Sequence, residues 1–485
     1  MSIKTQSLQG AIWTLAEKFG SRVLTLSIFF ILARLLDSQA FGIVAIVTSI
    51  VHFMEIFVEQ GLTASLIQKE DIDELDKQSA FWGSLLIGSV LYILVFLGAP
   101  LVSLIYDEPS FTYLLRLLGV VFPITAIATV PISMLQRELN FKPLAIRQLL
   151  AALVAGSVGI TLALRGMGAE SVIWYHLILG IVMHGTLFFL TPWRPKLMFS
   201  WERYKSLLSF GISITGNKLI FFGNGQLLGI VIGYFLGIPA AGYFGIAQKV
   251  MTTVRDIIQS TMSRIAFPLF SKFQSKPKEL ESVFKNISEK VSAISFPIFF
   301  FIIACSSEIV IIFFGEQWTL SIPLLQWQVA SLIPGMIVTL NNDIMLGMGK
   351  SGLCFRFQVY GTLFSILLLL GAPYYGLIWV AAISAMQMIF MLPLGINMTR
   401  PFFKIMRKDI LLPVVKSLAV GAVLGAALVL FDQLVSFEKE IYQLIAKSVL
   451  SLILLPALYY VFHQGLIMEG KNQVRSFLHK IKPTS

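Results

Sequence analysis

The chain has few charged residues and almost no cysteine. Asp, Glu, Lys and Arg make up 13% of its 485 residues, against about 25% in a typical soluble domain. With 56% hydrophobic residues and a mean hydropathy of +0.81, this composition excludes a soluble globular protein and indicates an integral membrane protein. The two cysteines, Cys305 and Cys354, both lie in apolar stretches, so no disulfide framework is expected.

Signals for bound metals, nucleotides and covalent catalysis are also missing. The five histidines form no metal-ligand spacing, so no metal site is expected. Gly349-Lys350-Ser351 ends like a phosphate-binding loop, but Ile344 stands where the first glycine of that motif belongs, so no nucleotide cofactor is expected. The connections on one side of the expected spans are too short to hold a catalytic domain. The sequence therefore indicates a transporter with no catalytic residues rather than an enzyme.

Apolar runs long enough to cross a bilayer as helices follow one another along the whole chain. We expect an all-α polytopic membrane protein with about fourteen spans, near 10–36, 39–67, 79–106, 111–135, 144–164, 169–191, 205–236, 239–268, 287–314, 318–346, 352–372, 374–398, 410–432 and 440–462. The segment 239–268 is polar for a span, and if it did not cross, every later connection would change sides.

Basic residues gather in the connections on one side of these spans, as in PFFKIMRKDILLP and GKNQVRSFLHK. Because cytoplasmic loops carry an excess of Lys and Arg, both termini are expected in the cytoplasm. The N-terminus MSIKTQSLQG has no apolar region that ends in a cleavage site. We therefore expect the first span to act as an uncleaved signal anchor.

An internal repeat follows the first and the seventh expected spans. LLDSQAFGIVAI (35–46) resembles GIPAAGYFGIAQ (237–248), and Lys18 has a counterpart in Lys218. Parallel repeats of this kind relate two lobes by a pseudo-two-fold axis along the membrane normal, with substrate bound between them. We expect a lobe of spans 1–6 (1–200), a lobe of spans 7–12 (201–400), and spans 13–14 with a basic tail (401–485).

The first span, GAIWTLAEKFGSRVLTLSIFFILARLL, carries Lys18 and Arg22 four residues apart, on one helical face. A basic side chain near the bilayer centre costs about 2.5–3.5 kcal/mol on insertion scales, so such a face normally lines a protein interior or an aqueous cavity. We interpret this helix as one wall of a pathway for an anionic substrate. The alternative is that Lys18 extends to the headgroups, because residues 19–36 nearly span alone.

On the second span, Thr48, His52, Glu55 and Glu59 share one face. Carboxylates at this depth suggest coupling to protons or Na⁺, because burial favours the protonated form. The alternative is that Glu55 pairs with Lys18 or Arg22 of the first span. Both readings stay open at the level of sequence.

The seventh and eighth spans add Lys218 and then Lys249, Arg255 and Asp256. We expect no contact between Arg255 and Asp256, because adjacent residues on a helix do not face each other. The cations outnumber the acids on the four charged spans, and Arg and Lys suit phosphate oxygens. The expected cationic cavity consists of Lys18, Arg22, Lys218, Lys249 and Arg255, and the candidates for ion coupling are Glu55, Glu59 and Asp256.

The chain resembles the polysaccharide transporter family of the multidrug/oligosaccharidyl-lipid/polysaccharide (MOP) flippase superfamily, closest in type to colanic-acid and O-antigen exporters. The likeness covers essentially the whole chain. It rests on GAIWTLAEKFGSRVLTLSIFFILARLLDSQAFGIVAIV, FVEQGLTASLIQKED and FPITAIATVPISMLQRELNFKPLAIRQ.

The resemblance implies two six-helix lobes that alternate access by rocking. It also implies that an undecaprenyl-pyrophosphate-linked oligosaccharide is flipped across the bacterial inner membrane, with membrane lipids and a polysaccharide polymerase or export machinery as partners. Nucleic acid is not an expected partner. The alternatives are another carrier of this superfamily, such as a lipid II flippase or multidrug antiporter, and a membrane polysaccharide polymerase or ligase.

Overall fold

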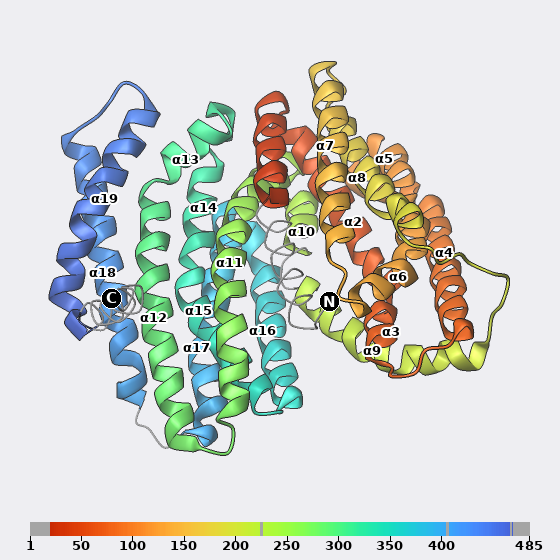
Figure 1. Ribbon diagram of the computed structural model, residues 1–485. Coiled ribbons are helices and arrows are strands. Elements are labelled where there is room, and N and C mark those ends of the chain that lie inside the picture. Colours follow the sequence, from red (N-terminus) through yellow and green to blue (C-terminus); the bar gives the residue numbers. More distant parts are fainter. Residues whose placement is uncertain (1–19, 224–226, 404–406, 466–467, 469–485) are drawn as a thin grey trace, which may run out of the picture. The chain divides into compact units, whose positions relative to one another are not determined.

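The computed structural model describes residues 20–223, 227–403, 407–465 and 468 (Figure 1). The secondary structure in these ranges is helical, without a strand, which confirms the predicted all-α class. The chain forms two compact units, Met1–Gly245 and Ile246–Ser485. The lobe boundaries predicted at 200 and 400 stay a prediction.

Unit 1 begins with a helix over 20–35. It continues with α2 (Ser38–Glu59), α3 (Leu62–Gln68), α4 (Glu74–Tyr106), α5 (Ser110–Gly119), α6 (Val121–Arg137), α7 (Lys142–Leu164), α8 (Ala169–Leu190), α9 (Trp201–Gly223), α10 (Leu227–Leu236) and the first turns of α11 (Ile238–Lys272). Asp37 begins α2 as an N-cap, because its carboxylate accepts a 2.8 Å hydrogen bond from the backbone N–H of Ala40.

Unit 2 contains the rest of α11 and the following helices: α12 (Pro277–Ala304), α13 (Ser306–Phe313), η1 (Glu316–Trp318), α14 (Ser321–Ala330), α15 (Leu332–Gly347), α16 (Ser351–Gly371), η2 (Ala372–Tyr375), α17 (Leu377–Thr399), η3 (Arg400–Phe402), α18 (Arg407–Leu434) and α19 (Glu440–Phe462). Within this unit α12 packs against α18, and α19 packs against α18 and α13 (Figure 1).

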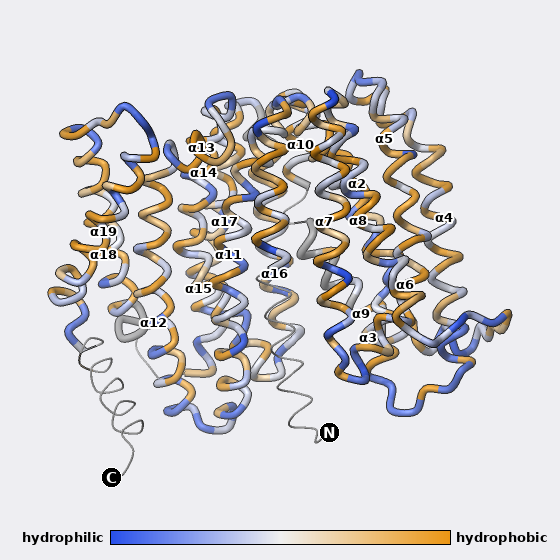
Figure 2. The backbone as a smooth tube through the Cα atoms, turned by 45° about the horizontal axis from the view of Figure 1, so that its top comes forward, coloured by the Kyte–Doolittle hydropathy of each residue, from blue (hydrophilic) through white to orange (hydrophobic). Residues whose placement is uncertain are grey.

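Eleven helical stretches of the described residues are long and apolar enough to cross a membrane. The expected spans outside this set are the first and the seventh, of which only parts are described, and the eighth. The eighth is one uninterrupted helix, α11, of 35 residues. Because of its charged residues, α11 is not among the eleven apolar stretches, and the number of fourteen spans stays a prediction. Hydrophilic residues lie mainly at helix ends (Figure 2).

Among the expected spans that the structure divides, two are divided four residues before a proline. Helix α5 ends at Gly119 and Pro123 follows in α6, while α14 ends at Ala330 and Pro334 follows in α15. Proline has no N–H to donate to the carbonyl four residues earlier, and its ring crowds that carbonyl. The hydrogen-bond ladder is therefore interrupted at these two points.

Within unit 1, the first turns of α2 and α11 cross in a reciprocal contact. A Cβ atom added to Gly42 would lie 1.9 Å from the carbonyl oxygen of Ile238, and one added to Gly242 would lie 2.2 Å from the carbonyl oxygen of Ser38. Each glycine is four residues after the first residue of its helix. The two helices therefore correspond at an offset of 200, which Lys18 and Lys218 share, whereas the repeated Phe-Gly-Ile at 41–43 and 244–246 is three residues out of this register.

Candidate functional site

The structure places some of the predicted cationic residues and leaves others outside its described part. Lys18 lies outside the described residues, and so does the side chain of Lys218, which belongs to α9. Arg22 is half-buried in the helix over 20–35 of unit 1, and Lys249 and Arg255 are half-buried on α11 in unit 2. The shared cationic cavity therefore stays a prediction.

Arg255 and Asp256 form an ion pair, so the prediction that they do not touch was wrong. Nε and Nη2 of Arg255 lie 3.3 and 3.2 Å from Oδ1 of Asp256. Adjacent Cβ atoms diverge on a helix, but the long arginine side chain folds back over the shorter aspartate. The two side chains are 31% and 45% exposed, and such a pair contributes no more than about 1 kcal/mol. A stronger anion could therefore displace Asp256 from the guanidinium at little cost.

Glu55 pairs with a histidine of its own helix. Oε2 of Glu55 lies 2.7 Å from Nδ1 of His52, one turn away on α2, and the hydroxyl of Thr125 on α6 donates a 3.4 Å hydrogen bond to Oε1. No described ion pair joins Glu55 to Arg22, and Lys18 lies outside the described residues, so the alternative in which Glu55 pairs with the first span stays a prediction. Glu59 is half-buried at the end of α2.

A second histidine extends this group. The ring of His176 on α8 lies 6.3 Å from the ring of His52 and 5.1 Å from the ring of Tyr175, edge to face in both cases. His176 thus contacts the histidine that pairs with Glu55. Sequence reasoning set His176 aside because it lacked metal-ligand spacing. The sequence feature that could have identified His176 is an ionisable residue in the middle of an apolar helix.

Unit 2 contains a buried carboxylate that sequence reasoning missed. Asp343 of α15 is 8% exposed, and the hydroxyl of Ser263 on α11 donates a 2.8 Å hydrogen bond to its Oδ2. The polar run Asn341-Asn342-Asp343 inside an apolar segment was the available signal.

A buried ion-pair cluster joins α19 to α13 and α18. The ammonium of Lys447, 1% exposed, pairs with Glu308, which is 3% exposed, and lies 2.5 Å from Oδ2 of Asp432. It also donates a 3.0 Å hydrogen bond to the carbonyl of Ala304. Since buried charges persist only when paired, this cluster fastens the last two helices to the rest of unit 2.

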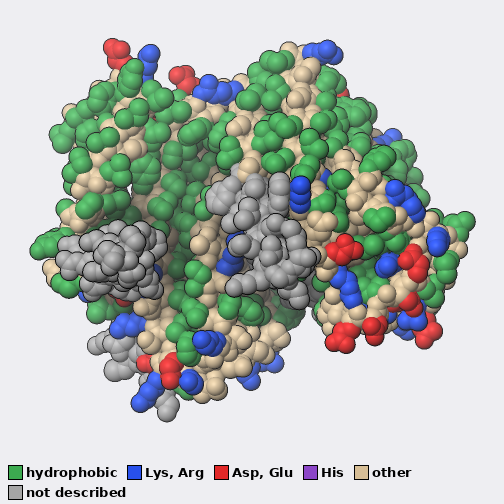
Figure 3. Space-filling view, viewed as in Figure 1, with side chains coloured by type: hydrophobic (Ala, Val, Ile, Leu, Met, Phe, Trp, Pro, Cys, Tyr) green, Lys and Arg blue, Asp and Glu red, His purple; other side chains and the backbone are tan. Residues whose placement is uncertain are grey.

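In unit 1, charged residues connect the segment after α3 to the first turns of α4 and α9. The buried carboxylate of Asp76 lies 2.6 Å from Nζ of Lys69 and 3.7 Å from Nη1 of Arg203. Asp73 caps α4, and the 2.7 Å hydrogen bond from the Asp76 backbone N–H lowers the pKa of the Asp73 carboxyl below its usual value. The first turn of α9 is thereby anchored to α4. In Figure 3, acidic and basic side chains gather at the lower right of the view, where Figure 1 labels α3 and α9.

Arg137 joins two of the stretches that carry the family resemblance. From the end of α6, its guanidinium donates hydrogen bonds to the carbonyls of Leu66 and Ile67, at 3.2 and 3.4 Å, and to those of Lys69 and Glu70. Leu66 and Ile67 are in the last turn of α3, where carbonyls have no partner within the helix, and Lys69 and Glu70 follow that turn. The segments FVEQGLTASLIQKED and FPITAIATVPISMLQRELNF therefore meet through one side chain.

Replacing Arg137 with alanine is expected to loosen the end of α3. The lost charge-assisted hydrogen bonds are partly exposed, so the expected destabilisation is about 1 kcal/mol. Arg137→Lys should recover little of it, because an ammonium cannot reproduce the planar fork of donors. Limited proteolysis between α3 and α4, with the melting temperature in detergent, measures the effect; cleavage no faster than in the unsubstituted protein contradicts it.

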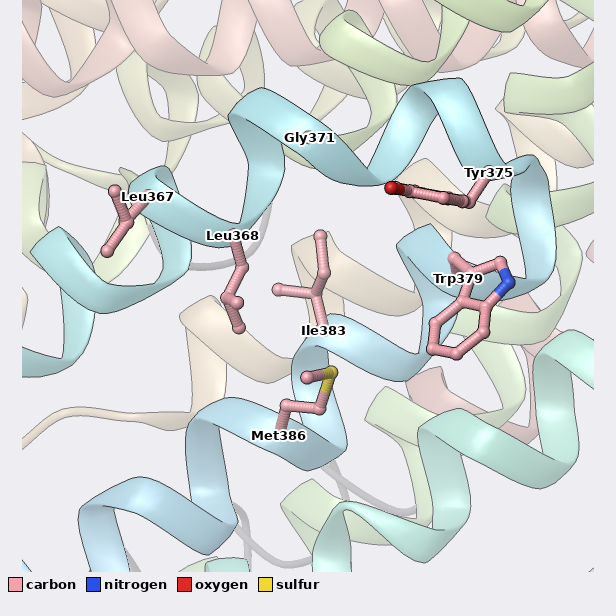
Figure 4. Close-up of a pocket in the computed structure, with 7 residues that line it drawn as sticks. All are labelled: Leu367, Leu368, Gly371, Tyr375, Trp379, Ile383 and Met386. Carbon is pink, nitrogen blue, oxygen red and sulfur yellow. The ribbon is translucent and has the colours of Figure 1, made fainter.

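The described residues also form an apolar pocket of about 350 Å³ in unit 2. It is lined by Leu367, Leu368, Gly371, Tyr375, Trp379, Ile383 and Met386. Figure 4 shows Leu368 of α16 and Ile383 and Met386 of α17 around the same space. This lining has no charged group, and none of the predicted site residues belongs to it.

Comparison with known proteins agrees with this architecture. The chain is 24% identical to the teichuronic acid biosynthesis protein TuaB of Bacillus subtilis, over 73% of this chain and 74% of that protein. It is 24% identical to the succinoglycan biosynthesis transport protein ExoT of Rhizobium meliloti, over 78% of this chain and 77% of that protein.

Among solved structures, the fold is similar to the lipid II flippase MurJ in an inward closed conformation, with a TM-score of 0.77 and 15% identity over 94% of this chain and 100% of that chain. It is also similar to an inward-facing multidrug resistance MATE transporter of the MOP superfamily, with a TM-score of 0.61 and 15% identity over 79% of this chain and 95% of that one. These likenesses confirm the predicted MOP-type fold. A sequence model of the family described as "Polysaccharide biosynthesis protein" matches residues 31–323, and the chain belongs to this family.

Proposed function

We propose that the protein is a flippase that moves lipid-linked oligosaccharide repeat units across the bacterial inner membrane for surface polysaccharide synthesis. The observation that carries this proposal is membership of the polysaccharide biosynthesis family in a chain with eleven candidate membrane spans. A relative over most of the chain is named a biosynthesis transport protein. The protein is a transporter rather than an enzyme, and an undecaprenyl-pyrophosphate-linked oligosaccharide is its proposed substrate.

The proposed mechanism uses the two repeats as lobes (1–200 and 201–400) that rock against each other, with 401–485 appended. The lipid tail stays in the bilayer while the pyrophosphate moves against a cationic cavity between the lobes. Its proposed lining is Lys18, Arg22, Lys218, Lys249 and Arg255. The weak, partly exposed pairing of Arg255 with Asp256 supports this role, because phosphate oxygens can replace that carboxylate in a bidentate contact.

Glu55, Glu59 and Asp256 are the proposed groups for coupling to an ion gradient. The contact between Glu55 and His52 supports this for Glu55, because an imidazole and a carboxylate 2.7 Å apart can share or exchange a proton. We further propose that both termini are cytoplasmic and that a polysaccharide polymerase or export machinery takes up the flipped units. The basic connections support this orientation.

Deletion of the gene tests the transport step directly. We expect lipid-linked single repeat units to accumulate in the cytoplasmic leaflet, where a labelling reagent that does not cross the membrane cannot reach them in intact spheroplasts. Accumulation of single units in the periplasmic leaflet would instead identify a polymerase or ligase. No accumulation in either leaflet would contradict both functions.

Charge reversal at Arg22 or Arg255 is expected to reduce polysaccharide export by at least about tenfold without loss of folded protein, because like charges would oppose the pyrophosphate. Arg165→Glu is the matched control, since Arg165 is exposed outside the predicted cavity. The exchange Arg255→Asp with Asp256→Arg keeps the local ion pair but moves the cation by one residue. Full export by this double variant would show that only the pair matters.

A multidrug antiporter would depend on the acidic residues rather than on the basic ones. In that case neutralising Glu55 or Asp256 would abolish transport while Arg22 and Arg255 were dispensable. The same set of variants, measured for export and for drug resistance, separates the two functions. Unchanged export after reversal of both arginines would remove them from the substrate pathway.

A further inference from the structure

Asp343 is a carboxyl group buried in a membrane-spanning helix, and no Lys or Arg among the described residues forms an ion pair with it. It lies in α15, inside the candidate span Ser321–Gly347, and is 8% exposed. Its one described hydrogen-bond partner is Ser263, whose hydroxyl lies 2.8 Å from Oδ2. This contrasts with the other deeply buried carboxylate of unit 2, Glu308, which pairs with Lys447.

The helices packed against α15 do not supply a neutralising charge. Helices α14 and α17 contain no charged residue. Among the charged groups on the other neighbours, Arg264 of α11, Lys285 of α12 and Arg356 of α16 are exposed, and no described ion pair joins them to Asp343. The thiol of Cys354 on α16 donates a 3.5 Å hydrogen bond to Oδ1 of Asn342, the residue before Asp343.

Two neighbours of Asp343 along α15, Leu340 and Ile344, belong to an apolar cluster. This buried cluster, which α11, α12 and α15 form together, also includes Met262, Ala266 and Phe284. An ionised carboxylate in such a place has lost most of its hydration and gained one described hydroxyl partner in return, which leaves its charge poorly compensated. Either a proton or a bound metal cation must neutralise it.

The ligand set favours the proton. A hard metal cation takes several oxygen ligands at once, whereas one carboxylate and one hydroxyl converge here. No group of three or more His, Cys, Asp or Glu among the described residues is placed to hold a metal ion. A single carboxyl oxygen is sufficient to bind a proton.

We propose that Asp343 is a proton-binding site of unit 2 that takes up one proton from water when it is buried and releases it when a conformational change exposes it. Uptake forms an O–H bond on a carboxylate oxygen, and release returns the same proton to water. Under the proposed export function, on which this part rests, Asp343 would couple a proton gradient to transport, separately from Glu55 in unit 1.

The test is infrared titration of the full-length protein in lipid nanodiscs, which needs no glycolipid and is thus independent of the proposed function. We expect the carbonyl band of a protonated carboxylic acid at neutral pH, its loss in Asp343→Asn, and its fading as the pH rises from about 6 to about 9. Ser263→Ala should keep the band but shift its frequency, because the hydrogen bond to the carboxyl is removed. Asp71→Asn, an exposed carboxyl, should leave the band unchanged.

Three outcomes overturn the proposal. Absence of any band that Asp343→Asn removes would mean that the group stays ionised. A band that persists over the whole pH range would mean a locked acid that never releases its proton. A band that disappears on addition of Na⁺ at constant pH would assign the site to sodium.

If the band behaves as expected, export in cells tests the coupling. Asp343→Asn should then lose the response of export to an imposed pH gradient, and Asp343→Glu should restore it. A normal response in Asp343→Asn contradicts coupling through this residue and leaves the flippase function itself untouched.

Discussion

Alanine in place of Gly42 or Gly242 is expected to reduce export by about tenfold or more. The new Cβ would lie 1.9 Å from the carbonyl oxygen of Ile238, or 2.2 Å from that of Ser38. Backbone atoms cannot rotate away, so the first turns of α2 and α11 must separate. A cost of about 1–3 kcal/mol is usual for such overpacking. This cost destabilises every conformation that keeps the contact between α2 and α11. A free-energy change of about 1.4 kcal/mol is sufficient to shift a conformational population tenfold.

Gly98→Ala is the matched control, because a Cβ at Gly98 in α4 has no atom within 4 Å. That variant should export normally, since alanine in a helix is favourable by up to about 1 kcal/mol relative to glycine. Export and the melting temperature in detergent are measured for all three variants. Normal export and stability in Gly42→Ala and Gly242→Ala would show that the reciprocal contact is not needed.

Replacing Lys447 with methionine is expected to destabilise unit 2 by about 3–5 kcal/mol, the largest stability effect that we anticipate. Methionine fills a similar volume, but Glu308 would then be buried without its cation, and the carbonyl of Ala304 would lose a donor. The expected result is a markedly lower melting temperature in detergent, measured at one fixed heating rate because membrane proteins often unfold irreversibly.

The double variant Lys447→Met with Glu308→Gln separates charge from packing. Removing the charges of Lys447 and Glu308 should recover most of the lost stability, since the remaining carboxylate of the cluster, Asp432, is 36% exposed and keeps its hydrogen bond from Gln443. Lys439→Met removes an exposed positive charge just before the same helix and should change little. A double variant as unstable as Lys447→Met alone would show that the ammonium contributes through packing and not through its charge.

The helix positions follow from the sequence because hydrophobic runs of span length dominate this chain. The segments expected near 144–164, 352–372 and 440–462 correspond to α7, α16 and α19 within a few residues. The polar segment 239–268 was the weakest expectation, yet α11 is one continuous helix. Its charged face lowers its hydropathy without weakening its helical hydrogen bonds.

Contacts between residues far apart in the chain could not be predicted from the sequence. Lys447 pairs with Glu308, 139 positions earlier, and periodicity gives no information on such a partner. The polar run Asn341-Asn342-Asp343 did mark Asp343 in the sequence, but its hydrogen-bond partner Ser263, 80 positions earlier, was not predictable. The Arg255–Asp256 pair shows a different limit: Cβ geometry predicts which faces residues occupy but not where a long side chain can bend.

The reciprocal crossing of α2 and α11 also bears on how the two halves of the chain have diverged. At an offset of 200, the counterpart of Glu55 is Arg255, and the counterpart of His52 is Thr252. If the halves descend from one duplicated ancestor, Gly42 and Gly242 have stayed the same in both copies. The position of Glu55 and Arg255, nearly four turns further along each helix, has acquired opposite charges. The shared backbone contact would thus have allowed one copy to specialise in acid chemistry and the other in binding anions.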